Sequence, residues 1–176
     1  MKRRYLLISI AVLAGLIAVS AFVPGPPVTK KFVATLSGRE EVPARDTSAK
    51  GFATFFWDAA AGGLGYSLSV HDINNVVASH IHCAAPGVNG PIGVTLFMGT
   101  AGSGPAEGVI AQGTLTSPDA GNACGWTSML AVVAAIQSGN AYVNVHTNDG
   151  VAPTNTGPGD FPGGEIRGQV RFLGAH

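Results

Sequence analysis

The sequence has few charges, few cysteines and only one long apolar segment. Charged residues make up 11% of the 176 residues, against about 25% in average globular chains, which excludes disorder driven by charge. No basic run follows Lys30 and Lys31, so a phosphate-binding stripe for nucleic acid and a polybasic patch for membranes are both excluded. The 46% of hydrophobic residues can close the core of one domain.

The N-terminus has the layout of a signal peptide. Three basic residues at positions 2–4 precede the apolar segment 6–23, small residues predict cleavage after Ala21, and prolines follow. An uncleaved anchor is the alternative, because 18 apolar residues are just enough to span a bilayer. We expect residues 1–21 to be signal peptide or anchor, 22–31 a linker and 32–173 the domain. The protein would then be secreted, periplasmic or at the cell surface, and would touch a membrane only through an uncleaved N-terminal segment.

Export makes the charge and the cysteines interpretable. Cleavage would leave seven basic against ten acidic residues, a net charge near −3. In an oxidising compartment Cys83 and Cys124 most simply form one disulfide, which would close a loop of about forty residues and stabilise the fold by about 3 to 4 kcal/mol. The alternative is that Cys83 is a metal ligand beside His82.

Short β-rich runs recur from Phe32 onwards, separated by Gly, Pro, Asn and Asp, which is typical of a sandwich or barrel. We predict strands at residues 32–36, 51–57, 64–71, 76–82, 92–98, 109–115, 141–147 and 165–172. Residues 126–137 have apolar side chains at helical spacing, and residues 148–164 form a long loop with little to bury. The predicted fold is all-β, a Greek-key β-sandwich of about eight antiparallel strands in two sheets, with one short helix.

Three histidines concentrate in two of these strands. His80 and His82 alternate on one strand, so both imidazoles project from the same face about 7 Å apart at the Cα level. His146 lies on a strand whose valines mark the other face, so it can complete a three-histidine site suited to copper or zinc. The alternative is that the three imidazoles hydrogen-bond backbone or carboxylate groups without any metal.

A fourth histidine is expected to lie apart from this group. If residues 72–75 form a hairpin turn, His71 pairs with Val76 and Ser67 falls opposite His80. Four strand residues at about 3.3 Å each then separate His71 from the level of His80. We expect a solvated histidine at this position.

Other polar residues could support the histidines. Glu165 and Arg167 share a strand face, so they can pair with each other or orient a histidine, and Asn144 alternates with His146. An ordinary surface ion pair is the alternative. The sequence contains no Gly-x-Ser-x-Gly elbow and no phosphate-binding loop, so serine hydrolases and nucleotide binding find no support.

Several blocks of residues carry a resemblance to one known family. They are Leu36-Ser37-Gly38, Glu41-Val42-Pro43, Ala49-Lys50-Gly51, Leu64 to Leu68, Ser79-His80-Ile81-His82, Pro86 to Pro91, Tyr142 to Thr147 and Pro162 to Gln169. In this order, between Phe32 and Phe172, they resemble the CHRD domain, a module named after the extracellular protein chordin. The resemblance implies an exported module and assigns no activity.

A looser similarity runs to Cu/Zn superoxide dismutase, an exported Greek-key sandwich with a disulfide. There His80 and His82 would match the copper-binding pair and His146 a later ligand, although a bridging histidine and a zinc loop are missing. Arg167 could supply the cationic approach that superoxide needs. Fold analogy does not establish function.

These observations support three hypotheses. The first is an exported binding module that holds a transition metal, copper favoured over zinc, through His80, His82 and His146, with Asn144, Glu165 and Arg167 behind these ligands. The second is a structural or adhesive module that binds an extracellular protein and needs no metal. The third, least favoured, is a copper-dependent redox enzyme.

Overall fold

Antiparallel strands make up most of the described chain. The computed structural model describes residues 30–174, so the expected signal peptide and residues 22–29 of the expected linker lie outside the described part. The strands are β1 (Lys30–Ser37), β2 (Lys50–Asp58), β3 (Gly63–Asn74), β4 (Val76–His82), β5 (Ile92–Met98), β6 (Pro105–Leu115), β7 (Tyr142–Thr147), β8 (Ile166–Gln169) and β9 (Arg171–Phe172). A 3-10 helix, η1 (Gly38–Glu40), and an α-helix, α1 (Met129–Gln137), complete the elements.

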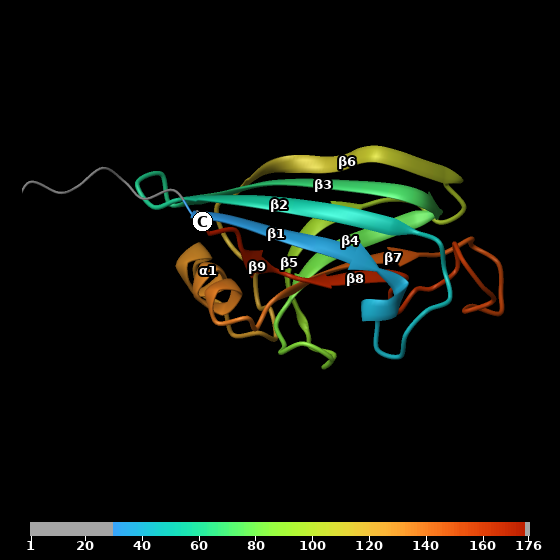
Figure 1. Cartoon of the computed structure of the whole chain (residues 1–176). Coiled ribbons are helices and arrows are strands. Elements are labelled where there is room, and N and C mark those ends of the chain that lie inside the picture. Colours follow the sequence, from blue (N-terminus) through green and yellow to red (C-terminus); the bar gives the residue numbers. More distant parts are fainter. Residues whose placement is uncertain (1–29, 175–176) are drawn as a thin grey trace, which may run out of the picture.

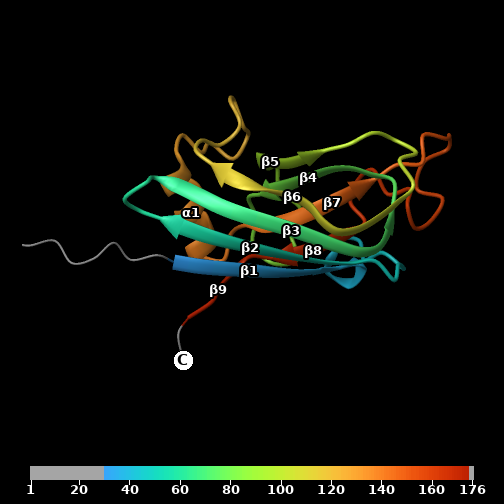
Figure 2. The ribbon, with the colours of Figure 1, turned by 90° about the horizontal axis from the view of Figure 1, so that it is seen from above.

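All nine strands belong to one hydrogen-bonded sheet (Figures 1 and 2). The strand order is β5-β4-β7-β8-β1-β2-β3-β6, and β9 pairs with β1. The sheet curls until its two ends approach, and the hydroxyl of Tyr66 on β3 donates to the Leu96 carbonyl on β5 at 2.9 Å. The predicted all-β fold with a single α-helix is confirmed; the layers of the sandwich are two halves of one nearly closed sheet.

The core lies between these two halves. Strand β2 shows the alternation that builds it, because Ala53 and Phe55 are buried while Phe52 and Phe56 point outward and are exposed. Helix α1 lies at the end of the molecule nearest the β2–β3 turn (Figures 1 and 2) and contributes four side chains to the same core. The helix begins after Ser128, whose hydroxyl accepts from the Ala131 amide.

The hairpin that would pair His71 with Val76 does not form, so that prediction was wrong. Strand β3 pairs with β2 and β6, whereas β4 pairs with β5 and β7. Between them the chain crosses from one half of the sheet to the other at Asn75, whose φ is +55°. The Asn75 side chain bonds the Gly104 amide and the Gly159 carbonyl, so long-range contacts fix this crossing.

Strands β4, β7 and β8 are buried on both faces. Their inner face carries apolar side chains such as Ile81, Val143 and Ile166, and their outer face is polar and covered by loops. Contrary to the expectation that the 148–164 loop has little to bury, its Asp160 and Phe161 are buried. Within residues 30–174, no helix is long and apolar enough to cross a membrane.

The free edge of β5 is capped by a side chain rather than by a strand. Asp119 accepts from the Thr95 amide through Oδ1 at 3.1 Å and from the Thr95 hydroxyl through Oδ2 at 2.7 Å. The Asp119 amide in turn donates to the Gly93 carbonyl at 3.0 Å. These bonds fasten the 116–128 segment along β5.

Candidate metal centre

Three histidines meet on the covered outer face of β4 and β7. Since β4 pairs with β7, the alternating His80 and His82 lie beside His146, and one ligand nitrogen of each lies within 4.8 Å of the others. His80 and His82 are buried, and His146 is half-buried. Two imidazoles bound to one tetrahedral zinc at about 2.0 Å place their nitrogens about 3.3 Å apart. His80 Nδ1 and His146 Nε2 are 3.1 Å apart and share a hydrogen bond, which a metal bound by both atoms would have to replace.

Backbone carbonyls orient two of the three rings. His82 Nδ1 donates to the Gly90 carbonyl at 2.9 Å, and His146 Nδ1 donates to the Pro162 carbonyl at 2.8 Å. A proton fixed on Nδ1 leaves Nε2 as the acceptor nitrogen, the form found in metal-ligating histidines. The Nε2 lone pair of His146 accepts from His80 Nδ1 at 3.1 Å. His82 Nε2 is buried and has no hydrogen-bond partner among the described residues. A metal ion would satisfy this atom.

Burial keeps the three imidazoles neutral. It lowers the pKa of His80 to about 4, with further lowering by the charges of His146 and His82. Burial also lowers the pKa of His82 to about 4, although the bond to Gly90 opposes this, and it lowers the pKa of His146. Neutral imidazole is the form that binds metal, so protons compete with a metal only under acidic conditions.

An aromatic stack supports His82 from the side. Its ring lies on Tyr142 at 4.8 Å between centroids, and the guanidinium of Arg167 lies 3.4 Å from the Tyr142 centroid. Arg167 also donates to the side-chain oxygen of Asn89 at 3.1 Å and to the Val88 carbonyl at 2.8 Å. Because this guanidinium is buried and bonded to the covering loop, it does not line an open approach for an anion such as superoxide.

The other two supporting candidates bind loops rather than histidines. Glu165 accepts from the hydroxyls of Thr47 and Thr147 at 2.6 and 2.7 Å and from the Gly159 amide at 2.8 Å. It makes no ion pair with Arg167. Asn144 lies opposite His80 across the β4–β7 pair, and its amide donates to Glu41 at 2.8 Å. These residues fasten the loops that cover the site.

The match to a family model identifies the domain. The model described as CHRD domain matches residues 32–170. The chain belongs to the CHRD family. Searches of curated proteins and of solved structures return no significant match, so the similarity to Cu/Zn superoxide dismutase rests on sequence pattern alone.

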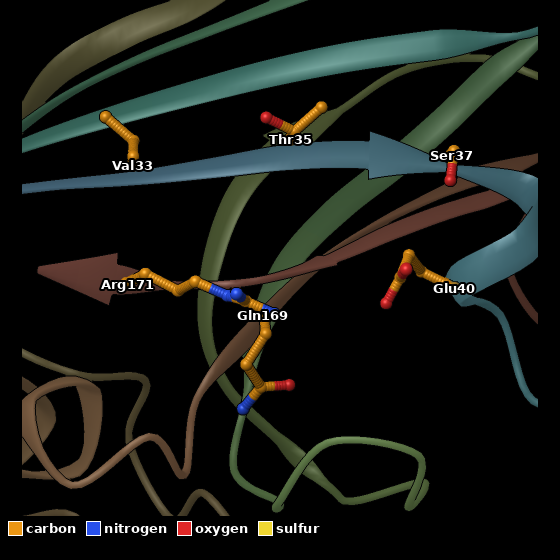
Figure 3. Close-up of a pocket in the computed structure, with 6 residues that line it drawn as sticks. All are labelled: Val33, Thr35, Ser37, Glu40, Gln169 and Arg171. Carbon is orange, nitrogen blue, oxygen red and sulfur yellow. The ribbon is translucent and has the colours of Figure 1, made fainter.

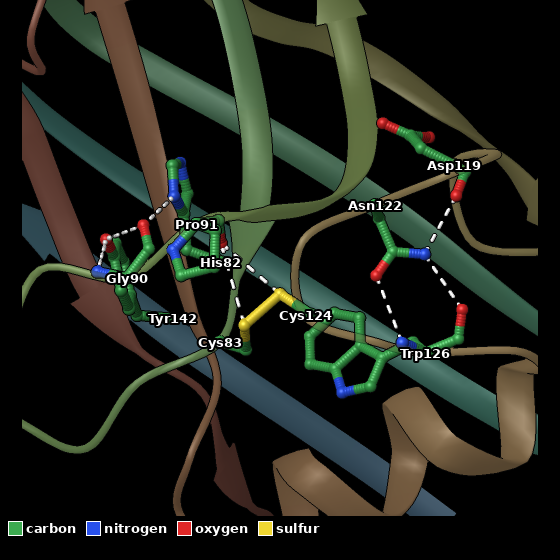
Figure 4. Close-up of a disulfide and its surroundings, with 9 residues drawn as sticks. All are labelled: His82, Cys83, Gly90, Pro91, Asp119, Asn122, Cys124, Trp126 and Tyr142. Atoms are coloured by element: carbon green, nitrogen blue, oxygen red, sulfur yellow. Dashed lines mark hydrogen bonds between the residues drawn. A yellow bond between two sulfur atoms is a disulfide. The ribbon is translucent and has the colours of Figure 1, made fainter.

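In this CHRD domain the two cysteines form a disulfide, as the oxidising-compartment argument predicted (Figure 4). Cys83 follows His82 directly and is bonded to Cys124, so it is not available as a metal ligand. His71 also lies apart from the group of three histidines. Its exposed ring contacts Glu107 at 2.9 Å on the surface.

Some residues of the site were missed by sequence reasoning. Tyr142 alternates with Asn144 and His146 on β7, so its place beside His82 could have been inferred from the period of two. Glu41 lies far away in sequence; burial raises its pKa to about 7, although Arg167 and Arg45 oppose this. The carbonyls of Gly90 and Pro162 have no side-chain signature that a sequence could reveal.

A separate hollow lies on the outer face of β1 in the CHRD domain. It measures about 300 Å³ and is lined by Val33, Thr35, Ser37, Glu40, Gln169 and Arg171 (Figure 3). None of the three histidines lines it. The three histidines therefore lie on the loop-covered face and away from this open hollow.

Proposed function

We propose that this CHRD domain is an exported metal-binding module whose ligands are His80, His82 and His146. The observation that carries the proposal is the orphaned Nε2 of His82, a buried lone pair held in place by the bond from Nδ1 to Gly90. Leaving such an atom unpaired costs about 1 to 3 kcal/mol, and a metal ion would offset this cost. The disulfide suits an exported protein, because disulfides persist in oxidising compartments.

Copper is the favoured ion. The converging groups are neutral imidazoles, which suit copper and zinc, and a given nitrogen site binds Cu²⁺ more tightly than Zn²⁺. His80 and His146 are the other ligands, and Tyr142 and the backbone carbonyls would keep the rings in place. Asn144, Glu165 and Arg167 would act behind the ligands by holding the covering loops.

The test is metal content. The protein purified from the exported fraction is loaded with copper or zinc, freed of excess metal and measured by elemental analysis. We expect about one tightly held ion per chain, and X-ray absorption should report a first coordination sphere of imidazole nitrogens. Absence of retained metal would overturn the proposal.

A protein-binding module that needs no metal is the second candidate. Phe52 and Phe56 favour it, because both point outward from β2 and are 44% and 43% exposed. In that case the histidines would stabilise the fold without a metal, and replacing His82 would unfold protein that had been produced without metal. A copper-dependent redox enzyme has less support, since Arg167 is bound inside the covering loop and gives no cationic approach.

A further inference from the structure

The disulfide joins two segments that meet directly behind His82. Cys83 is the first residue after β4, and Cys124 belongs to the 116–128 segment fastened along β5 (Figure 4). That segment is rigid near Cys124, because the Asn122 amide group donates to the carbonyls of Asp119 and Trp126, both at 2.8 Å. The bridge therefore ties Cys83 to a fixed point.

Cys83 in turn helps to set the position of Gly90, together with the Tyr142 hydroxyl, which accepts from the Gly90 amide at 3.1 Å and donates to the Gly90 carbonyl at 3.4 Å. The Cys83 amide donates to the Pro91 carbonyl at 3.2 Å and so closes the base of the loop between β4 and β5. Gly90 packs so close that an added Cβ would lie 2.0 Å from the Cys83 carbonyl oxygen. The carbonyl of Gly90 is the group that accepts from His82 Nδ1. A shift of Cys83 would therefore move the group that orients this ring.

We propose that the Cys83–Cys124 disulfide is a positioning element of the metal centre, which reaches its full affinity only after this bond has formed. The inference rests on the proposed metal-binding function. Arg167 also anchors the loop through Val88 and Asn89, so part of the order survives without the disulfide. Loss of groups that orient metal ligands costs about 10- to 100-fold in affinity, and we expect about tenfold here.

The bond forms by thiol–disulfide exchange. Cys83 and Cys124 give up two protons and two electrons as the sulfur–sulfur bond forms. The disulfide of a thiol oxidoreductase in the compartment that receives the exported protein takes them up and becomes a dithiol. Thiols stay reduced in the cytosol. The high-affinity site would thus be completed after export, which would disfavour capture of cytosolic metal by the unexported chain.

Zinc titration of the protein with and without the disulfide tests this inference. Calorimetry with Zn²⁺ compares the oxidised protein with the C83S/C124S double variant, and far-UV circular dichroism checks that both are folded. We expect the variant to bind zinc about tenfold more weakly. Equal affinities would overturn the positioning role and leave the metal-binding function intact, whereas absence of both zinc and copper binding in both proteins would overturn both.

A measurement on the unmodified disulfide covers the case in which the double variant does not fold. Zinc held by His82 should fix the loop and slow reduction of the bridge by a water-soluble phosphine severalfold. The control is His82→Ala, in which zinc should leave the reduction rate unchanged. Equal rates with and without zinc in the wild-type protein would contradict the proposal.

Discussion

The two halves of the sheet treat their outer faces in opposite ways. On the open half, formed by β1, β2, β3 and β6, the outer face meets solvent with hydroxyl side chains and with Phe52 and Phe56. On the covered half, formed by β4, β7 and β8, loops bury the outer face, and its side chains include histidine, tyrosine, asparagine, arginine and glutamine. Buried polar groups need hydrogen-bond partners because burial removes their bonds to water. The loops supply these partners as backbone carbonyls and carboxylates.

The exceptions to this pairing are concentrated in the covered half. Among the described residues, three buried side-chain atoms have no partner, namely His82 Nε2, Asn144 Oδ1 and Asp160 Oδ1. All three belong to β4, β7 or a loop that covers them. Of these three atoms, His82 Nε2 is the one that the proposed metal ion would satisfy.

Replacing one histidine in each half gives the largest contrast. His82→Ala should abolish stoichiometric metal binding, because it removes a ligand whose lone pair is already placed. His71→Ala on the open half should leave metal content at about one ion per chain, since its ring is exposed and contacts only Glu107. Elemental analysis after loading measures both, with circular dichroism to confirm folding. Equal metal content in the two variants would contradict the assignment of the metal site to the covered half.

Replacing one glutamate in each half compares stability. Glu165→Ala would leave the hydroxyls of Thr47 and Thr147 and the Gly159 amide without their acceptor, at a cost of about 3 kcal/mol in unfolding free energy. Glu107→Ala should leave stability unchanged, because this carboxylate is exposed. Urea unfolding of the metal-free proteins measures both. A Glu165 variant as stable as the wild type would show that the loops hold without this carboxylate.

Arginine-to-lysine changes should separate geometry from charge. Arg167→Lys keeps the charge but loses the planar fork that binds Asn89 and Val88 and stacks on Tyr142, which we expect to cost about 2 kcal/mol. Arg171→Lys, on the exposed strand β9, should have no measurable effect. The comparison uses thermal or urea unfolding. Similar losses in both variants would mean that the stack on Tyr142 contributes nothing.

The smallest expected effect is on pH dependence, because two trends oppose each other. His80 and His82 have a folded pKa of about 4 against 6.5 when unfolded, so their contribution to stability is lost as pH falls from 6.5 towards 4. Glu41, with a folded pKa of about 7 against 4.5, contributes stability at low pH that is lost as pH rises from 4.5 through 7. The two changes partly cancel between pH 4.5 and 6.5.

Glu41→Gln should remove the second trend. Its urea midpoint should therefore fall more steeply on acidification from pH 6.5 to 4.5 than that of the wild-type protein, both free of metal. Parallel curves for the two proteins would contradict the opposing roles of Glu41 and the histidines.

Alternation along single strands was the most informative sequence signal. The predicted strands at 76–82 and 92–98 match β4 and β5 residue for residue, and the convergence of the three histidines was anticipated from the period of two. The split of the last strand was not predicted, because Val170 leaves the ladder and its amide donates to the Ala141 carbonyl instead.

Long-range contacts explain what the sequence did not reveal. A turn signal at residues 72–75 cannot distinguish a hairpin from a crossing, since that choice depends on β3 pairing with β2 and β6. The carbonyls that accept from His82 and His146 are backbone groups, which every residue has, so the sequence does not mark them. The sequence therefore predicted that the three histidines lie together, whereas the carbonyls that orient two of their rings could be identified only in the folded chain.

The cap on β5 has a consequence for how this protein behaves at high concentration. An edge strand with free amides can recruit strands from other copies and start aggregation. Asp119 occupies the Thr95 amide and places a carboxylate where a neighbouring strand would have to lie. Asp119 thus blocks strand pairing at the middle of β5, and the same segment carries the cysteine that is bonded to Cys83 behind His82.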